Sequence, residues 1–196
     1  MKLVIASGNA GKLAEFRQLL GEAGIDCVAQ GELGVGDVEE TGLSFVENAL
    51  LKARHAALVT GLPALADDSG LCVDALGGAP GLYSARYAGG HGDAQANIDK
   101  LLDALREVPD ERRGAHFHAA IVLLRHAEDP QPLIAEGSWH GRILHARRGD
   151  GGFGYDPVFL DPERGRSAAE LDPALKNRIS HRGLALATLR EKLPLL

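Results

Sequence analysis

The sequence is poor in cysteine and has no long hydrophobic run. Its two cysteines, Cys27 and Cys72, lack the spacing of metal ligands, so buried free thiols are the simplest interpretation. No apolar stretch approaches the length of a membrane-spanning helix, and only four apolar residues lie between Lys2 and Ser7, too few for a secretory signal. We therefore expect a cytoplasmic protein that does not enter a membrane.

An excess of positive charge is also missing. The chain carries 21 basic and 27 acidic residues, a formal net charge of -6, which argues against a protein that coats nucleic acid through charge. A hydrophobic content of 45% in 196 residues is enough to bury one substantial core. We therefore expect residues 1–196 to form a single domain without a nucleic-acid partner.

The N-terminal segment contains a short apolar strand that turns through glycines into a helical pattern. The turn comprises Ser7, Gly8, Asn9, Ala10, Gly11 and Lys12. Free backbone N–H groups at the helix start, the helix dipole and Lys12 together favour a bound phosphate. The spacing is not that of a Walker A loop, and Leu13 stands where that loop has a hydroxyl for magnesium. Any metal ligands must therefore come from elsewhere, and an ordinary turn between strand and helix is the alternative interpretation.

Strand and helix signals alternate along the rest of the chain. Strands are expected at residues 26–29, 62–67, 71–74, 116–125, 133–138 and 158–160, with a Ser-Gly turn between the second and third of these. Helices are expected from a capping box at Ser44 to about Thr60, from Asp93 through Leu105, after Asp172, and from Ser180 to about Leu193. This order favours a mixed α/β sheet with helices packed on it.

Two pairs of neighbouring carboxylates stand out. Glu39 and Glu40 lie in a loop before a predicted helix, and Asp67 and Asp68 end a predicted apolar strand. Adjacent side chains of a strand point to opposite faces, so Asp67 and Asp68 cannot both face one ligand unless the strand has already turned. Carboxylate oxygens suit magnesium. A solvated acidic loop for the first pair and an Asx-capped turn for the second are the alternatives.

A glycine-rich loop at residues 149–154 matches the dinucleotide-binding fingerprint by letter only. Residues 155–157 and then a predicted strand follow it, whereas the fingerprint requires a helix. We interpret the loop as a platform that presents Phe153 and Tyr155, because aromatic rings on loops stack on nucleobases. A hairpin with two core aromatics is the alternative.

Polar donors are concentrated near the C-terminus, between Lys176 and Arg182. Ser180 is a predicted N-cap, which would put His181 and Arg182 at the amino end of the last helix, where a cation opposes the helix dipole. Such a placement suggests a ligand rich in hydrogen-bond acceptors. A solvated basic turn is the alternative.

Together these segments resemble the inosine triphosphate pyrophosphatase, or Ham1-like, family in its bacterial branch. Five motifs occur in register over nearly the whole chain: Ser7-x-Asn9-x-x-Lys12, residues 39–42, residues 67–70, residues 153–156 and residues 180–182. The one clear variation is Tyr155, where some relatives carry tryptophan. The resemblance implies an α/β fold, a mixed sheet with flanking helices in two lobes around a deep cleft, and a homodimer.

The resemblance also implies an activity and a set of site residues. The reaction hydrolyses inosine, deoxyinosine and xanthosine triphosphates to the monophosphate and pyrophosphate, with Mg²⁺. Asp68 is implied as the base for the attacking water, and Glu40 and Asp68 as metal ligands, while Asp67 is expected to point away. The implied substrate-binding residues are Ser7, Gly8, Asn9, Ala10, Gly11, Lys12, Lys52, Ser69, Phe153, Gly154, Tyr155, Asp156, Lys176, His181 and Arg182.

Two other classes of protein remain as alternatives at this point. A noncatalytic nucleotide-binding module would keep Lys12 and Phe153 but would not need Glu40 and Asp68. A dinucleotide oxidoreductase built on the glycine-rich loop is disfavoured because no helix follows that loop. Release of pyrophosphate from inosine triphosphate in the presence of magnesium distinguishes all three.

Overall fold

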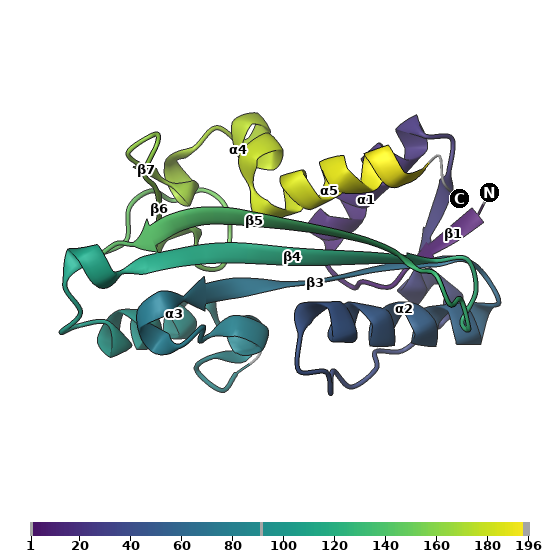
Figure 1. Ribbon diagram of the computed structural model, residues 1–196, viewed down its shortest axis with the longest axis horizontal. Helices are drawn as coiled ribbons and strands as arrows, with labels where there is room; N and C mark the ends of the chain where they lie inside the picture. The colour runs from purple at the N-terminus through teal and green to yellow at the C-terminus, as the bar shows by residue number, and fades with distance from the viewer. Residues whose placement is uncertain (1, 91, 194–196) are drawn as a thin grey trace. The chain divides into compact units, whose positions relative to one another are not determined.

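A computed structural model of the chain describes residues 2–90 and 92–193 (Figure 1). The main elements are β1 (Lys2–Ile5), α1 (Ala10–Glu22), β2 (Asp26–Ala29), α2 (Phe45–Thr60), β3 (Ala64–Val73), α3 (Ala94–Ala104), β4 (Gly114–Leu124), β5 (Leu133–Ile143), β6 (Phe159–Asp161), β7 (Arg166–Ser167), α4 (Pro173–Ile179) and α5 (His181–Lys192). In the described part of the chain, no helix is long and apolar enough to cross a membrane.

The strands form one mixed seven-stranded sheet in the order β2-β1-β3-β4-β5-β6-β7. β1 pairs in parallel with β2 and β3, whereas β6 pairs in antiparallel fashion with β5 and β7. The expected α/β class with a mixed sheet and flanking helices is confirmed.

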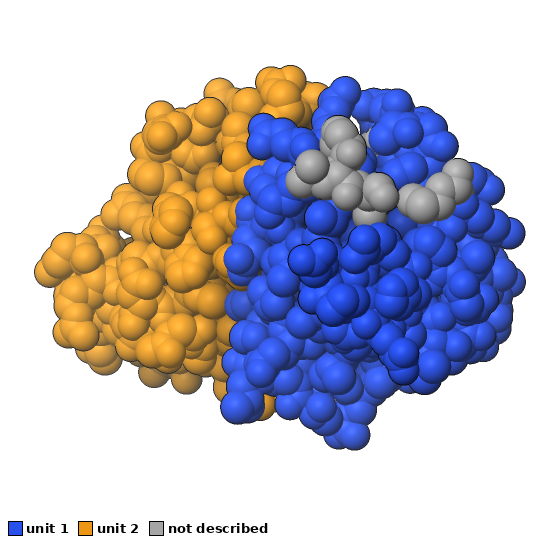
Figure 2. Space-filling model, turned by 45° about the vertical axis from the view of Figure 1, so that its right-hand side comes forward, with its two compact units in different colours: residues 1–68, 119–136, 185–196 blue, residues 69–118, 137–184 orange. Residues whose placement is uncertain are grey.

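The chain divides into two compact units, which Figure 2 shows in blue and orange. Unit 1 comprises residues 1–68, 119–136 and 185–196, and unit 2 comprises residues 69–118 and 137–184. Three strands, β3, β4 and β5, begin in one unit and end in the other. The expectation of a single domain over residues 1–196 stays a prediction.

Unit 1 has a core on each face of its part of the sheet. Leu3 and Ile5 of β1 pack with Phe16 and Leu20 of α1 and with residues of α5. Val4, between them in sequence, packs instead with the alanine-rich face of α2. Because side chains alternate along a strand, one short apolar run can fill both cores. In unit 2, by contrast, the buried residues of β3, β4 and β5 form a single cluster with α3 and the segment after residue 155.

The predicted helix starts are confirmed by their caps. Ser44 accepts from the Glu47 amide at the start of α2, and Asp93 accepts from the Ala96 amide at the start of α3. Asp172 caps α4 in the same way, and the Ser180 hydroxyl accepts from the Gly183 amide in the first turn of α5. In an ordinary capping box the Glu47 carboxylate would accept from the amide of the N-cap residue, Ser44. Here it accepts from the amide of the preceding residue, Leu43.

The predicted turn at Ser69-Gly70 is wrong. β3 runs without interruption through both residues, and neither has a left-handed backbone. Leu71 and Val73 beyond them are completely buried in the core of unit 2. A turn would remove both side chains from that core, so their burial outweighs the local turn preference of serine and glycine. The Asx-capped turn considered for this segment is therefore also excluded.

The turn between β4 and β5 depends on Asp129, and we predict that it makes the fold sensitive to acid. The carboxylate is almost completely buried and accepts from the Arg125 amide, the Arg125 guanidinium and the Gln131 amide at 2.6–2.9 Å. The hydrogen bond from the Arg125 side chain, supported by the backbone donors, lowers the pKa of Asp129 well below its usual range.

A carboxyl group whose pKa is lower in the folded than in the unfolded state stabilises the fold above its unfolded pKa of about 4, and this stability is lost as the pH falls below it. Asp129→Asn should lower the free energy of unfolding at pH 7 by about 2 kcal/mol. It should also reduce the loss of stability between about pH 4 and pH 2. Urea unfolding of both proteins at several pH values measures this. Equal acid sensitivity of the two proteins would contradict the prediction.

Candidate active site

The N-terminal turn presents polar groups at the start of α1. Asn9 is the N-cap: its Oδ1 accepts from the Lys12 amide at 3.1 Å, and its own amide donates to the Ser7 hydroxyl at 3.2 Å. The residues from Gly8 to Gly11 are exposed, and Ser7 is half-buried. The turn is therefore ordered by its own side chains and leaves the amino end of a 13-residue helix open to solvent.

Lys12 is held by Asp67. Its Nζ lies 2.7 Å from Oδ2 of Asp67, whose side chain is 1% exposed. As expected for neighbours on a strand, Asp67 and Asp68 make different contacts. Asp67 points away from the Asp68 contacts, as predicted, and its carboxylate holds the Lys12 ammonium group in position.

A second ion pair network joins the two carboxylate segments. The Lys52 Nζ lies 2.7 Å from Glu40 Oε1 and 3.1 Å from Asp68 Oδ1. Glu39 is exposed and Glu40 is half-buried, so the loop before α2 directs only its second glutamate to the network. The structure therefore brings together Glu40, Lys52 and Asp68, which the sequence analysis selected separately.

Asn48, which is not among the predicted site residues, links the same two segments. It is 2% exposed, its Nδ2 donates to Asp68 Oδ2 at 3.3 Å, and its Oδ1 accepts from the Gly42 amide at 2.8 Å. A Cβ at position 42 would lie 2.6 Å from the Glu47 Cβ, so only glycine allows the loop to approach α2 this closely. A signal was present, because Asn48 precedes Lys52 by four residues and shares its helix face.

The electrostatics of this network favour a basic carboxylate. Burial raises the pKa of Asp68, as does the Glu40 charge, while Lys52 and Asn48 oppose the rise. Burial acts to lower the pKa of Lys52, but the charge of Asp68 and the hydrogen bond to Glu40 raise it overall. Lys52 therefore stays a cation, and Asp68 is a better proton acceptor than an ordinary aspartate.

A separate cluster in unit 2 surrounds Phe153. The Phe153 ring is 60% exposed, with the Lys176 Nζ 4.7 Å and the Arg182 Cζ 5.8 Å from its centroid. Asp156 is buried, accepts from the Phe153 amide at 2.8 Å and forms an ion pair with Lys176. An exposed aromatic ring flanked by two cations is suited to a flat ligand with acceptor groups at its edge.

The remaining predicted residues lie in varied surroundings. His181 is buried and stacks on Phe117, with ring centroids 4.9 Å apart. Tyr155 is 5% exposed, so the expectation that the loop presents both aromatic rings holds for Phe153 and is wrong for Tyr155. Ser69 is half-buried in β3, directly after Asp68, and Gly154 is half-buried between the two aromatic residues.

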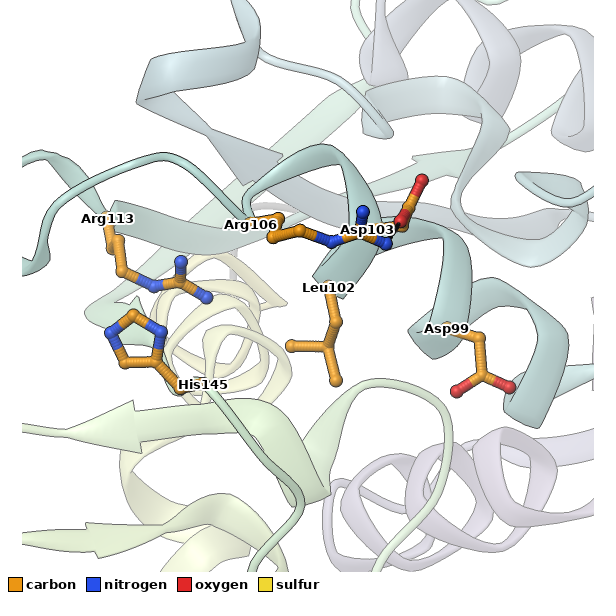
Figure 3. A pocket seen from close by; sticks show the side chains of 6 residues that line it. All are labelled: Asp99, Leu102, Asp103, Arg106, Arg113 and His145. Atoms are coloured by element: carbon orange, nitrogen blue, oxygen red, sulfur yellow. Dashed lines mark hydrogen bonds and ion pairs between the residues drawn. The ribbon is translucent and has the colours of Figure 1, made fainter.

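A cavity of about 350 Å³ in unit 2 contains none of the predicted site residues (Figure 3). It is lined by Asp99, Leu102, Asp103, Arg106, Arg113 and His145. Arg113 is almost completely buried, and its guanidinium donates to the carbonyl groups of Leu105 and Leu144 at 2.6 and 2.9 Å. These bonds tie the end of α3 to the end of β5, which is a structural role.

Comparison with known proteins gives a consistent result. The Ham1 family matches residues 3–192. The dITP/XTP pyrophosphatase of Xanthomonas campestris pv. campestris is 73% identical over 97% of this chain and 96% of its own length. The protein of the same name from Pectobacterium atrosepticum is 60% identical over 98% of each chain. The solved structure of a HAM1 protein from Coxiella burnetii has a TM-score of 0.95 and 52% identity, with complete coverage of both chains. The family match, the sequence identity to relatives and the similarity of fold all extend over nearly the whole length of the chain. The chain therefore belongs to the Ham1 family.

Proposed function

We propose that this protein hydrolyses non-canonical purine nucleoside triphosphates, namely inosine, deoxyinosine and xanthosine triphosphates, to the monophosphate and pyrophosphate. Such an activity clears deaminated purines from the nucleotide pool. The names of relatives at 73% and 60% identity support the substrate class. The observation that carries the chemistry is the convergence of Glu40 and Asp68 on Lys52, because a noncatalytic binding module would not need two carboxylates there.

Mg²⁺ is the proposed cofactor, with Glu40 and Asp68 as its protein ligands. Oxygen atoms of both carboxylates reach one atom, the Lys52 Nζ, at 2.7 and 3.1 Å, so they can also converge on one cation. Magnesium is usually bound by one or two carboxylates together with phosphate oxygens and waters, which this donor set fits. When bound, the ion would neutralise phosphate charge and make the phosphorus more electrophilic.

The residues of unit 1 are assigned to the triphosphate and the attacking water. Asp68, with its raised pKa, accepts a proton from the water whose attack breaks the bond between the α- and β-phosphates. Lys12 and Lys52 stabilise the negative charge that develops on the leaving pyrophosphate. Ser7, Asn9 and the amide groups of Gly8, Ala10 and Gly11 bind phosphate oxygens at the start of α1.

The residues of unit 2 are assigned to the purine. Phe153 stacks on the base, and His181 and Arg182 donate to the O6 acceptor of hypoxanthine or xanthine. Adenine carries an amino group at that position, so donors would face a donor, and such mismatches can discriminate by roughly 10⁴-fold. Asp156 and Lys176 complete the surroundings of the base edge. Gly154, next to Phe153, and Ser69, next to Asp68, are also assigned to substrate binding.

The organisation of the protein follows the same proposal. We assign residues 1–196 to one nucleotide-hydrolysing domain that acts in the cytoplasm as a homodimer, with a small nucleotide as substrate and neither nucleic acid nor a membrane as partner.

The expected products distinguish this reaction from stepwise dephosphorylation. With inosine triphosphate and Mg²⁺, inosine monophosphate and pyrophosphate should appear together from the first turnover, because Lys12 and Lys52 both stabilise a pyrophosphate leaving group. Early time points analysed by ion-exchange chromatography and phosphorus NMR measure this. Inosine diphosphate and orthophosphate as initial products would contradict the proposal, and omission of Mg²⁺ is the control.

A further inference from the structure

The conformation of the Phe153 loop depends on contacts within unit 2. The Asp156 carboxylate accepts from the Phe153 amide, and the chain wraps around it through Gly152, whose φ is +71°. A Cβ at position 152 would lie 2.1 Å from Asp156 Oδ2, so the turn needs glycine. These local bonds set the shape of the loop, but they do not anchor it to the rest of unit 2.

Tyr155 anchors the loop to the core of unit 2, in addition to the Asp156–Lys176 ion pair and the hydrogen bond from the Gly151 amide to the Ala169 carbonyl. Its ring is buried in the core cluster of unit 2, and its hydroxyl donates to the Ser84 carbonyl at 2.8 Å, across 71 residues of sequence. Burial raises the pKa of Tyr155, with a smaller contribution from Tyr87, so the hydroxyl keeps its proton and remains a donor. The residue lies between Phe153 and Asp156, so the bond restrains the loop near its middle.

The acceptor is itself firmly held. The Ser84 hydroxyl donates to the Gly81 carbonyl at 2.6 Å and accepts from the Leu71 amide of β3 at 2.9 Å. Asn97 of α3 is 3% exposed, and its side chain donates to the carbonyl groups of Ser84 and Ala85 at 3.4 and 3.3 Å. A strand and a helix therefore fix the position of the Ser84 carbonyl, and a fixed partner is what a positioning contact requires.

We propose that the Tyr155 hydroxyl is a positioning group for nucleobase binding: through the Ser84 carbonyl, which Asn97 holds, it orders the loop so that Phe153 is ready to stack on the purine. The inference rests on the proposed role of Phe153, and it assigns Tyr155, Ser84 and Asn97 to binding without contact to the substrate. Pre-ordering of a loop increases affinity because less conformational entropy is lost on binding.

The proposal predicts a split between the kinetic constants. Loss of one buried hydrogen bond in Tyr155→Phe should raise KM for inosine triphosphate about three- to tenfold. The value of kcat should stay within about twofold, because ordering of the base-binding loop favours substrate and transition state equally. Tyr83→Phe removes an exposed hydroxyl from the same unit and is the matched control, with no change expected in either constant.

Phe153→Ala and the double variant Tyr155→Phe/Phe153→Ala complete the test. Phe153→Ala alone should raise KM about 5- to 100-fold, the range expected when a stacking ring is lost. Adding Tyr155→Phe to it should raise KM no further, because no stacking ring is left to position. Urea unfolding of each variant at the assay temperature is the measurement that checks whether the variant is folded.

The outcomes separate the inference from the proposed function. An unchanged KM in Tyr155→Phe, or an equal rise with and without Phe153, would overturn the positioning role and leave base stacking intact. An unchanged KM in Phe153→Ala would overturn the stacking role first, and the inference with it. A purely structural hydroxyl would lower the free energy of unfolding of Tyr155→Phe without changing KM, which also counts against the proposal.

Discussion

Asp68→Asn is expected to lower kcat for inosine triphosphate by about 10²-fold or more, since general-base help alone typically contributes 10²- to 10⁴-fold. The amide cannot accept the proton of the attacking water, and it is a weaker ligand for a divalent cation. The shape of asparagine is nearly that of aspartate, so the fold should be kept. The local change is confined to the contacts of residue 68 with Asn48 and Lys52. Initial rates at saturating substrate and Mg²⁺ measure the effect.

Asp67→Asn is the matched control, because it makes the same chemical change at the adjacent residue. Asp67 contacts Lys12 and is not assigned to the water or the metal, so its loss should act through the position of that lysine. We expect a fall in kcat/KM of about tenfold or less, the cost of one weakened ion pair. Equal losses of kcat in the two variants would mean that the base has been assigned to the wrong carboxylate.

Arg182→Ala is expected to lower the selectivity for inosine over adenosine triphosphate by about 10- to 100-fold. The Arg182 guanidinium lies over the Phe153 ring, 5.8 Å from its centroid, and the proposal assigns it to the purine edge. Loss of a charged donor to O6 should reduce kcat/KM for the inosine substrate. Adenosine triphosphate has no acceptor at that position, so it has no hydrogen bond to Arg182 to lose. The ratio of the two specificity constants measures this.

Two further variants serve as controls for Arg182. Arg178→Ala removes an exposed arginine from α4 and should leave both the activity and the ratio unchanged. Lys12→Ala should lower kcat/KM for both substrates together, because the phosphate groups of the two are identical. If Arg182→Ala keeps the wild-type ratio, the residue supports the start of α5 and the base is recognised elsewhere.

Local features of this chain were readable from the sequence because their causes are local. Ser44, Asp93 and Asp172 cap helices with amides two or three residues away, so a few letters determine each helix start. The bounds of β2, residues 26–29, were predicted as they stand. The motifs that carry the family resemblance are likewise short segments whose residue types can be recognised before any fold is known.

The errors came from segments in which burial competes with local preference. Ser69 and Gly70 favour a turn, yet β3 continues through them because Leu71 and Val73 fill the core of unit 2. Tyr155 looks like a second stacking ring beside Phe153, yet its ring is buried and its hydroxyl bonds to Ser84. In both cases the decisive partner lies outside the segment, so no local pattern could show it.

By itself, the sequence determined the residue types of the candidate site, the helix starts and the mixed α/β class. Only the tertiary structure decided which of those residues meet. Lys12 contacts Asp67, and Lys52 contacts Glu40 and Asp68, across loops, strands and helices. The physical reason is that caps and turns are set by neighbours in sequence, whereas ion pairs and anchors such as Tyr155–Ser84 form only when the packing of the core brings distant segments into contact.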